Sequence, residues 1–184
     1  MTATLDPTLP QVAPLPPLAK ELVTGGLGLL ALGACAGLGS GDASVTLRAI
    51  PAALLVTGGA LALTTPSLLV GHQFLGLRAR PDALGAAIAV AFGHTGRVAL
   101  GLAPTMLFFS ATSGQWLPIG LLLLGAVSSF GLLDAVSRLT SAEPDTGPLP
   151  ALRHGGLVLA WMGLSALIAA RLAFDVFRFV LGGV

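Results

Sequence analysis

The sequence of 184 residues is poor in cysteine, in aromatic residues and in charge. Its single cysteine excludes an internal disulfide and any metal cluster built from thiolates. There is no tyrosine, and two tryptophans are too few for a complete aromatic belt at a membrane surface. Only 9% of the residues are charged, whereas soluble domains carry about a quarter. These absences exclude an ordinary soluble domain.

Apolar residues take the place of charge: they make up 54% of the chain, and the mean hydropathy is +0.91. About 20 consecutive apolar residues are enough for a helix to cross the hydrocarbon core of a bilayer. We therefore predict an all-α integral membrane protein, a bundle of five transmembrane helices at residues 22–41, 49–74, 83–110, 117–138 and 155–180. Residues 1–20 contain five prolines, which predict an extended cytoplasmic tail outside the membrane domain of residues 21–184.

The basic residues predict the orientation of the chain, because positive charge collects on the cytoplasmic side of membrane proteins. Five spans with the N-terminus inside leave only Arg48 and Arg178 outside. The inside then carries Lys20, Arg78, Arg80, Arg138 and Arg153. Arginine outnumbers lysine, and alanine, leucine and glycine are abundant, a bias typical of bacterial genomes rich in G and C. We expect a multi-pass protein of the bacterial inner (cytoplasmic) membrane with a cytoplasmic N-terminus.

Glycines recur at every fourth or eighth position in two of the predicted spans. Small residues on one face of a transmembrane helix let a neighbouring helix approach closely. The stripe of the third span also carries Arg97, which we therefore expect to point into the bundle. The glycines predicted to pack against other helices are Gly33, Gly37 and Gly41 in the first span and Gly85, Gly93 and Gly101 in the third.

The charged residues inside the spans need partners, because an ionised side chain at the bilayer centre costs about 2.5–3.5 kcal/mol on insertion scales. Arg97 lies roughly 21 Å along its helix from the cytoplasmic face and Asp175 some 27 Å along the fifth, so we predict that they pair. Arg171 and Arg178 share a helix face with Asp175 and are its local partners. Asp134 and Arg138 are expected to form a second pair near the cytoplasmic interface.

His94 lies one turn from Arg97 and would complete a polar cluster with Arg97, Asp175, Arg171 and Arg178. One interpretation is a conduction or proton-relay site. The other is a buried ion pair that fixes how the third and fifth helices dock. We favour the structural interpretation, because a single Arg–Asp pair without a second buried acid is a poor ion pathway.

Other chemically capable residues predict no catalytic or metal site. His72 and His154 are both expected near the cytoplasmic face, but no third ligand is evident, so we expect no metal and no other cofactor. Cys35 ends the run Leu-Gly-Ala-Cys, which is similar to the bacterial lipobox. The preceding tail is broken by prolines and carries one positive charge, which favours a helix contact over lipidation. Ser128 and Ser129 lack an acid–base partner and are interpreted as packing residues.

Segments at residues 65–70, 74–78, 103–110 and 174–182 share a pattern that resembles a group of small bacterial inner-membrane proteins with no established function. Some members are labelled as actin-binding, and others are grouped with the five-helix Yip membrane-trafficking fold. The resemblance implies architecture and not activity. The tail has a single lysine and no basic Leu-Lys-Lys-Thr-like segment, so this chain departs from the actin-binding label.

These patterns predict a non-catalytic subunit, scaffold or assembly partner in a larger membrane complex, because the glycine stripes exceed what one small bundle needs. The expected partners are membrane lipid and other membrane proteins or further copies of the chain. A net charge of +1 gives no reason to expect nucleic acid. The alternative is a small ion or solute transporter or channel that uses Arg97, Asp175 and His94.

Overall fold

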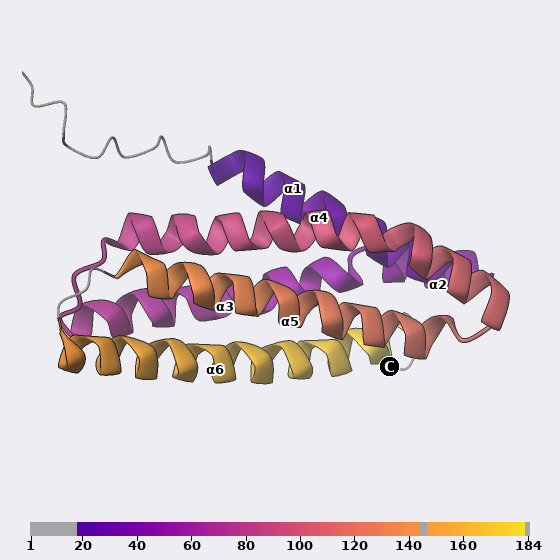
Figure 1. The fold of residues 1–184 in the computed structure, drawn as a ribbon. Helices are drawn as coiled ribbons and strands as arrows, with labels where there is room; N and C mark the ends of the chain where they lie inside the picture. Colours follow the sequence, from indigo (N-terminus) through magenta and orange to yellow (C-terminus); the bar gives the residue numbers. More distant parts are fainter. Residues whose placement is uncertain (1–17, 144–146, 183–184) are drawn as a thin grey trace, which may run out of the picture.

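The structure, a computed structural model, describes residues 18–143 and 147–182. Within these ranges every regular element is an α-helix, and there is no strand. The helices are α1 (Leu18–Leu38), α2 (Ala43–Ala49), α3 (Ala52–Phe74), α4 (Pro81–Ser113), α5 (Trp116–Ala142) and α6 (Pro148–Val180) (Figure 1). Five stretches are long and apolar enough to cross a membrane, with α2 and α3 counted as one. The prediction of an all-α bundle is thereby confirmed.

The first two predicted spans have different limits in the structure. The predicted first span ends at Gly41, but α1 ends at Leu38, and Gly41 sits in the following turn with φ +71°. The Asp42 carboxylate then accepts the backbone N–H of Ser44 at 2.7 Å and starts α2. The predicted second span starts only at residue 49. Pro51, which has no N–H to donate, separates α2 from α3.

The later helices lie close to their predicted positions but are longer. Helix α6 begins seven residues before the expected start at residue 155, and α4 and α5 extend by one to four residues at each end. Polar and proline-containing end turns belong to these helices although they interrupt the apolar pattern. Most of the predicted tail lies outside the described residues, and its last three residues form the first turn of α1.

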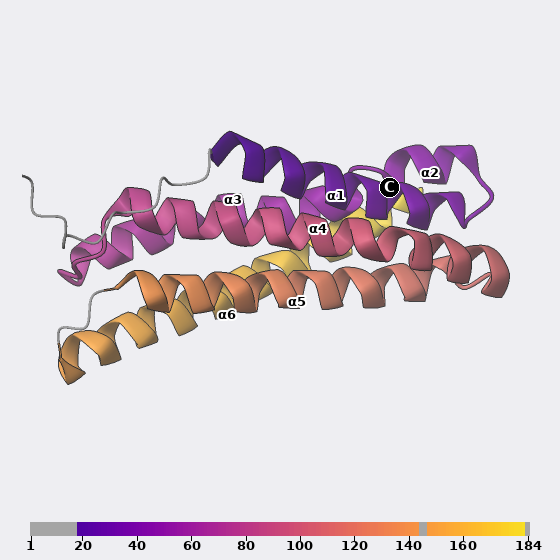
Figure 2. The ribbon, with the colours of Figure 1, turned by 45° about the horizontal axis from the view of Figure 1, so that its top comes forward.

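The long helices run roughly along one axis, as the two views in Figures 1 and 2 agree. Helix α4 packs mainly on α1 and α5, and α3 packs mainly on α6. The α3–α4 and α5–α6 connections lie together at one end, which we call the histidine end because His72 and His154 lie there (Figure 1). The α4–α5 connection and α2 lie toward the other end, which we call the α2 end.

Apolar side chains form two buried clusters inside this bundle. The first includes Leu68, Leu84, Leu139 and Trp161 and joins α3, α4, α5 and α6. The second joins α1, α3, α4 and α5, and Cys35 packs against its edge. Helix α1 thus lies on the second cluster, and α6 lies on the first.

Glycines bring α1 against α4, although not all of those predicted. A Cβ atom at Gly28 would overlap the backbone of Gly96, and one at Gly25 would overlap Phe92. Gly33 and Gly37 do pack closely, against the α2–α3 junction and α2, and Gly93 faces Glu21. Within the described residues the prediction is wrong for Gly41, Gly85 and Gly101, because no atom of that part of the chain lies within 4 Å of a Cβ placed at these positions.

Candidate functional site

Arg97 has a different partner from the one predicted. Its Nη2 atom donates to both carboxylate oxygens of Glu21, at 2.8 and 2.7 Å. The Glu21 side chain is only 8% exposed, and the missing side chain of Gly93 makes room for it. The predicted Arg97–Asp175 contact is therefore wrong. The distance of a residue along its helix predicts its height in the bundle. It does not predict which neighbouring helix lies beside that residue.

Asp175 pairs instead within its own helix. Arg171 Nη2 lies 3.1 Å from Asp175 Oδ1, the local pairing that the spacing of four residues predicts. Arg171 and Arg178 also lie 5.8 and 5.9 Å from the ring centroid of Phe174. These four residues, which we call the α6 charged patch, face outward: the Arg171 side chain is 69% exposed and that of Asp175 is 47% exposed.

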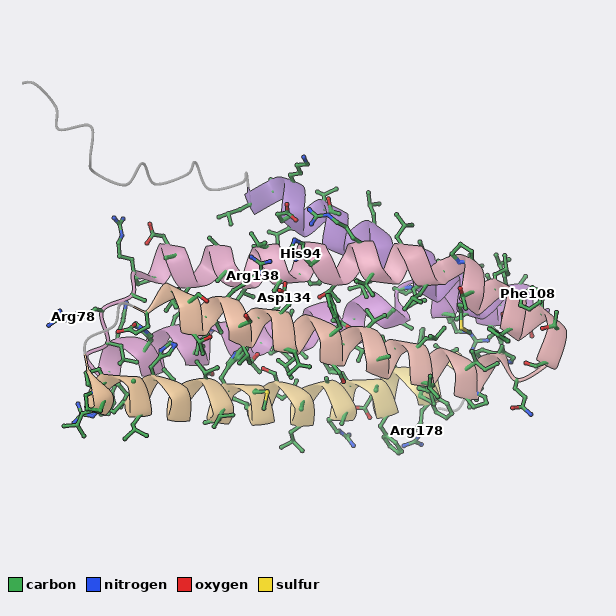
Figure 3. The ribbon with its side chains drawn as sticks, viewed as in Figure 1. Arg78, His94, Phe108, Asp134, Arg138 and Arg178 are labelled. Atoms are coloured by element: carbon green, nitrogen blue, oxygen red, sulfur yellow. The ribbon has the colours of Figure 1, made fainter. Side chains whose placement is uncertain are left out.

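His94 belongs to a cluster between α4 and α5, and not to a cluster with Arg97 and Asp175 (Figure 3). The Asp134 carboxylate accepts from Arg138 Nε at 2.9 Å, so the predicted pair is present. His94 Nδ1 lies 3.1 Å from Asp134 Oδ2 and 3.0 Å from Arg138 Nη2. A guanidinium only donates, so Nδ1 can accept from Arg138 only when it carries no proton. When Nδ1 carries a proton, it donates a hydrogen bond to the Asp134 carboxylate instead.

The His94 cluster lies beside a groove with a volume of about 560 Å³. Asp134 and Arg138 form part of its polar wall, together with two serines of α5. Alanines of α4 form much of the opposite wall. This groove holds the ion pair at one side of the bundle, between two helices only.

The histidine end contains a second polar cluster, of which the sequence predicted the common level of His72 and His154 but not the third member, Glu143. His72 Nε2 lies 2.9 Å from Glu143 Oε2, and the rings of His72 and His154 meet edge to face with centroids 5.8 Å apart. Glu143 also accepts the backbone N–H groups of Arg78 at 2.9 Å and of Ala79 at 3.0 Å. The signal that could have found it is the pair of acids just after the fourth span, Glu143 and Asp145, at the level expected for His72 and His154.

Glu143 is held in its ionised form. Burial alone would raise the pKa of this carboxyl group, but the N–H groups of Arg78 and Ala79 and the His72 side chain outweigh burial and lower the pKa below its ordinary value. An ionised carboxylate beside two imidazoles is a donor set that suits a divalent transition metal.

A cavity of about 190 Å³ lies between the two pairs of helices, α4 with α5 and α3 with α6. The hydroxyl groups of Thr57 and Ser128 share one hydrogen bond at 2.8 Å, and those of Thr64 and Ser165 share another at 2.9 Å. Thr95 and Ser129 also line the cavity, and none of its lining residues is charged. The hydroxyl groups make this the polar centre of an otherwise apolar bundle.

The fold defines a helical bundle with five stretches able to span a membrane. Its polar groups include the ion pairs of His72, His94 and Arg97 with their acidic partners. Comparison with known proteins adds no relative: no family model, no curated protein and no solved structure matches the chain. The resemblance to small bacterial inner-membrane proteins therefore stays a prediction.

Proposed function

We propose that this protein is a non-catalytic subunit of a larger complex in the bacterial inner membrane, with its N-terminus in the cytoplasm. We also propose that it binds a transmembrane helix of a different membrane protein through the outward face of α6. The observation that carries this proposal is the combination, on one helix face, of exposed small residues and the α6 charged patch.

The small residues of that face include Gly156, Ala160 and Gly163, all exposed. A Cβ atom at either glycine would meet no atom of the described residues within 4 Å, so neither glycine is needed for close packing within the part of the chain that the structure describes. Spacing of small residues by four, as in Gly156 and Ala160, is typical of faces where a second transmembrane helix approaches closely.

The charged patch supports the same face independently. Arg171 lies nine residues before the end of α6, about 14 Å along the helix. Helix α6 itself ends short of the α4–α5 connection (Figure 1). Lipid is a poor environment for an exposed ion pair at such a depth. Two arginines and one aspartate leave the patch with a net charge of +1, which favours a partner helix that carries a carboxylate over a second copy of α6.

The test is native mass spectrometry of the protein extracted mildly from its own host. We expect a fixed stoichiometry with one other integral membrane protein that has a carboxylate within a span. Gly163→Leu and Arg171→Leu should each abolish the association, as should neutralising the partner's carboxylate. Gly101→Leu, at an equally open glycine on α4, is the matched control and should retain it. Recovery of the protein alone, or only with itself, would overturn the proposal.

A transport function is the second candidate, and the cavity at the polar centre favours it. Uncharged hydroxyl walls suit a small neutral polar solute, and Arg97, His94 and Asp175 do not line the cavity. Liposomes containing the protein should then take up glycerol faster than empty liposomes. The double variant Thr57→Val and Ser128→Val should slow uptake, whereas Ser141→Ala, outside the cavity, should not. Uptake equal to that of empty liposomes would exclude this candidate.

A further inference from the structure

Three side chains from different parts of the chain meet at the histidine end. His72 lies in the last turn of α3, Glu143 follows α5, and His154 lies near the start of α6. One ligand atom from each residue lies within 4.8 Å of those of the other two. His72 and His154 are 1% and 4% exposed, and the Glu143 side chain is 6% exposed. Such a set is unusual in a buried position unless its polar atoms have partners.

One atom of this set has no hydrogen-bond partner among residues 18–143 and 147–182. His154 Nε2 lies 3.1 Å from the carbonyl oxygen of Leu139, which can only accept, so Nε2 carries the proton. Nδ1 of the same ring then carries a lone pair, and it is buried with no hydrogen-bond partner. The Trp161 indole N–H is also buried without a partner among the described residues, but it is a donor and cannot bind a cation.

This arrangement is the one that metal-binding histidines adopt. A ligating imidazole commonly donates its second N–H to a carbonyl or carboxylate, which fixes the ring and aims the other nitrogen at the metal. The Leu139 carbonyl supplies that support to His154. The backbone N–H groups of Arg78 and Ala79 supply it to Glu143, so its carboxylate keeps its orientation when His72 exchanges a hydrogen bond for a metal bond.

We propose that His72, Glu143 and His154 bind one divalent transition metal ion, with zinc as the best fit to two imidazoles and a carboxylate. His72 Nε2, a Glu143 oxygen and His154 Nδ1 are the ligands. A zinc ion bound at about 2.0–2.2 Å needs its ligands about 3.4 Å apart. His72 Nε2 and Glu143 Oε2, now 2.9 Å apart, would separate slightly, and the wider gaps of the set, which do not exceed 4.8 Å, would close by up to about 1.4 Å. The bound ion would fasten α3, α6 and the segment after α5 together. This inference is independent of the proposed subunit function.

The decisive experiment is zinc titration by calorimetry of the full-length protein in detergent, after treatment with EDTA and without an oligohistidine tag. We expect one zinc ion per chain and a melting temperature that rises on binding. Glu143→Gln and His154→Gln should each weaken binding by roughly 100-fold or more, because loss of even a supporting residue costs 10–100-fold. His94→Gln is the matched control, since it removes a histidine beside a carboxylate elsewhere, and it should bind as the unaltered chain does.

Cobalt substitution keeps the proposal testable if a variant fails to fold. The unaltered protein with one equivalent of Co²⁺ should show the visible absorption of a four-coordinate ion, and added Zn²⁺ should remove it. Circular dichroism of Glu143→Gln establishes that its helices are intact before its affinity is compared. Absence of both zinc binding and the cobalt spectrum in the unaltered protein overturns the proposal. Equal zinc affinity in Glu143→Gln, His154→Gln and His94→Gln does so as well.

Discussion

The two ends of the bundle are held by different kinds of contact. At the histidine end, Glu143 reaches across to a backbone segment and a side chain that precede it by more than 60 residues. At the α2 end, polar contacts are mainly local, such as the Asp42 cap, and the long-range one joins Arg48 Nη1 to the Phe179 carbonyl at 3.2 Å in an exposed position. Polar contacts between distant parts of the chain therefore stabilise the histidine end, whereas hydrogen bonds within turns are the main polar contacts at the α2 end.

Space between the helices is found toward both ends. An apolar cavity of about 80 Å³ lies toward the α2 end, and its lining includes Ala49 of α2, Trp116 of α5 and Phe177 of α6. Toward the histidine end, the groove of about 560 Å³ runs between α4 and α5 as far as Ala83 and Ala142, while the first apolar cluster and the imidazole rings lie in the interior. From the contacts of Glu143 we expect the histidine end to be the more stable of the two, and the predictions below test this difference.

The largest effect is expected at Glu143. Glu143→Ala leaves the exposed N–H of Arg78, the N–H of the buried residue Ala79 and the buried His72 side chain without their acceptor. A buried polar group without a partner costs about 1–3 kcal/mol, so we expect a loss of roughly 3 kcal/mol from the two buried groups. Thermal unfolding in detergent should show a melting temperature lower by about 6–12 °C. Arg48→Ala at the α2 end should change it little, because Arg48 is exposed. Equal losses from the two variants would contradict the difference between the ends.

The next effect is expected where α1 meets α4. Gly28→Ala places a Cβ on the backbone of Gly96, and separating the helices costs about 1–3 kcal/mol. Gly26→Ala is the control, since its Cβ meets nothing within 4 Å and alanine favours the helix. Hydrogen exchange should increase in α1 for Gly28→Ala alone. If exchange rose at the histidine end instead, α1 would be coupled to that end and the comparison would need revision.

A smaller effect is expected for the ion pair that lies between the ends. Glu21→Gln leaves Arg97 with a neutral partner, and we expect a loss of about 1–2 kcal/mol because Arg97 is partly exposed. Exchanging the two residues, by Glu21→Arg with Arg97→Glu, should restore most of the melting temperature lost in either single reversal. Rescue of Arg97→Glu by Asp175→Arg would instead support the pairing predicted from the sequence.

The smallest effect is expected at Asp42. Hydrogen bonds from the Ser44 side chain and from the backbone N–H groups of Ser44 and Val45 hold the pKa of Asp42 below its ordinary value. Its contribution is therefore present above the unfolded pKa, about 3.9, and is lost as pH falls through the lower folded value. Hydrogen exchange of α2 should rise at acid pH, and Asp42→Asn should remove that pH dependence while keeping the cap. If hydrogen exchange of α2 still rose at acid pH in Asp42→Asn, a group other than Asp42 would be responsible for that rise.

Long apolar runs with few charges were sufficient to predict five spans, because crossing a bilayer demands length and apolarity that little else produces. The Asp134–Arg138 and Arg171–Asp175 pairs were likewise predictable, since a spacing of four fixes neighbours on one helix. Contacts between helices were not predictable from spacing. Arg97 meets Glu21 because α1 begins partway along α4, and the local sequence pattern does not predict this offset.

Glu143 shows the same limit in another form. A lone glutamate before a proline is typical of a surface loop, and only the fold brings it to His72. The close packing of Gly28 on Gly96 was missed because the glycines were read at a spacing of four, whereas Gly25 and Gly28, like Gly93 and Gly96, are three residues apart.

The offset between α1 and α4 has a consequence for how the molecule stands in a bilayer. The charge-free part of α1 starts after Glu21, which pairs with Arg97, and Arg97 is about 24 Å from the beginning of α4. The charge-free part of α6 starts after Arg153, about 8 Å from the beginning of its helix at that same end. The apolar band around the bundle is thus oblique to its long axis. A flat membrane matches an oblique band when the bundle leans, so we expect the bundle to be tilted in a bilayer.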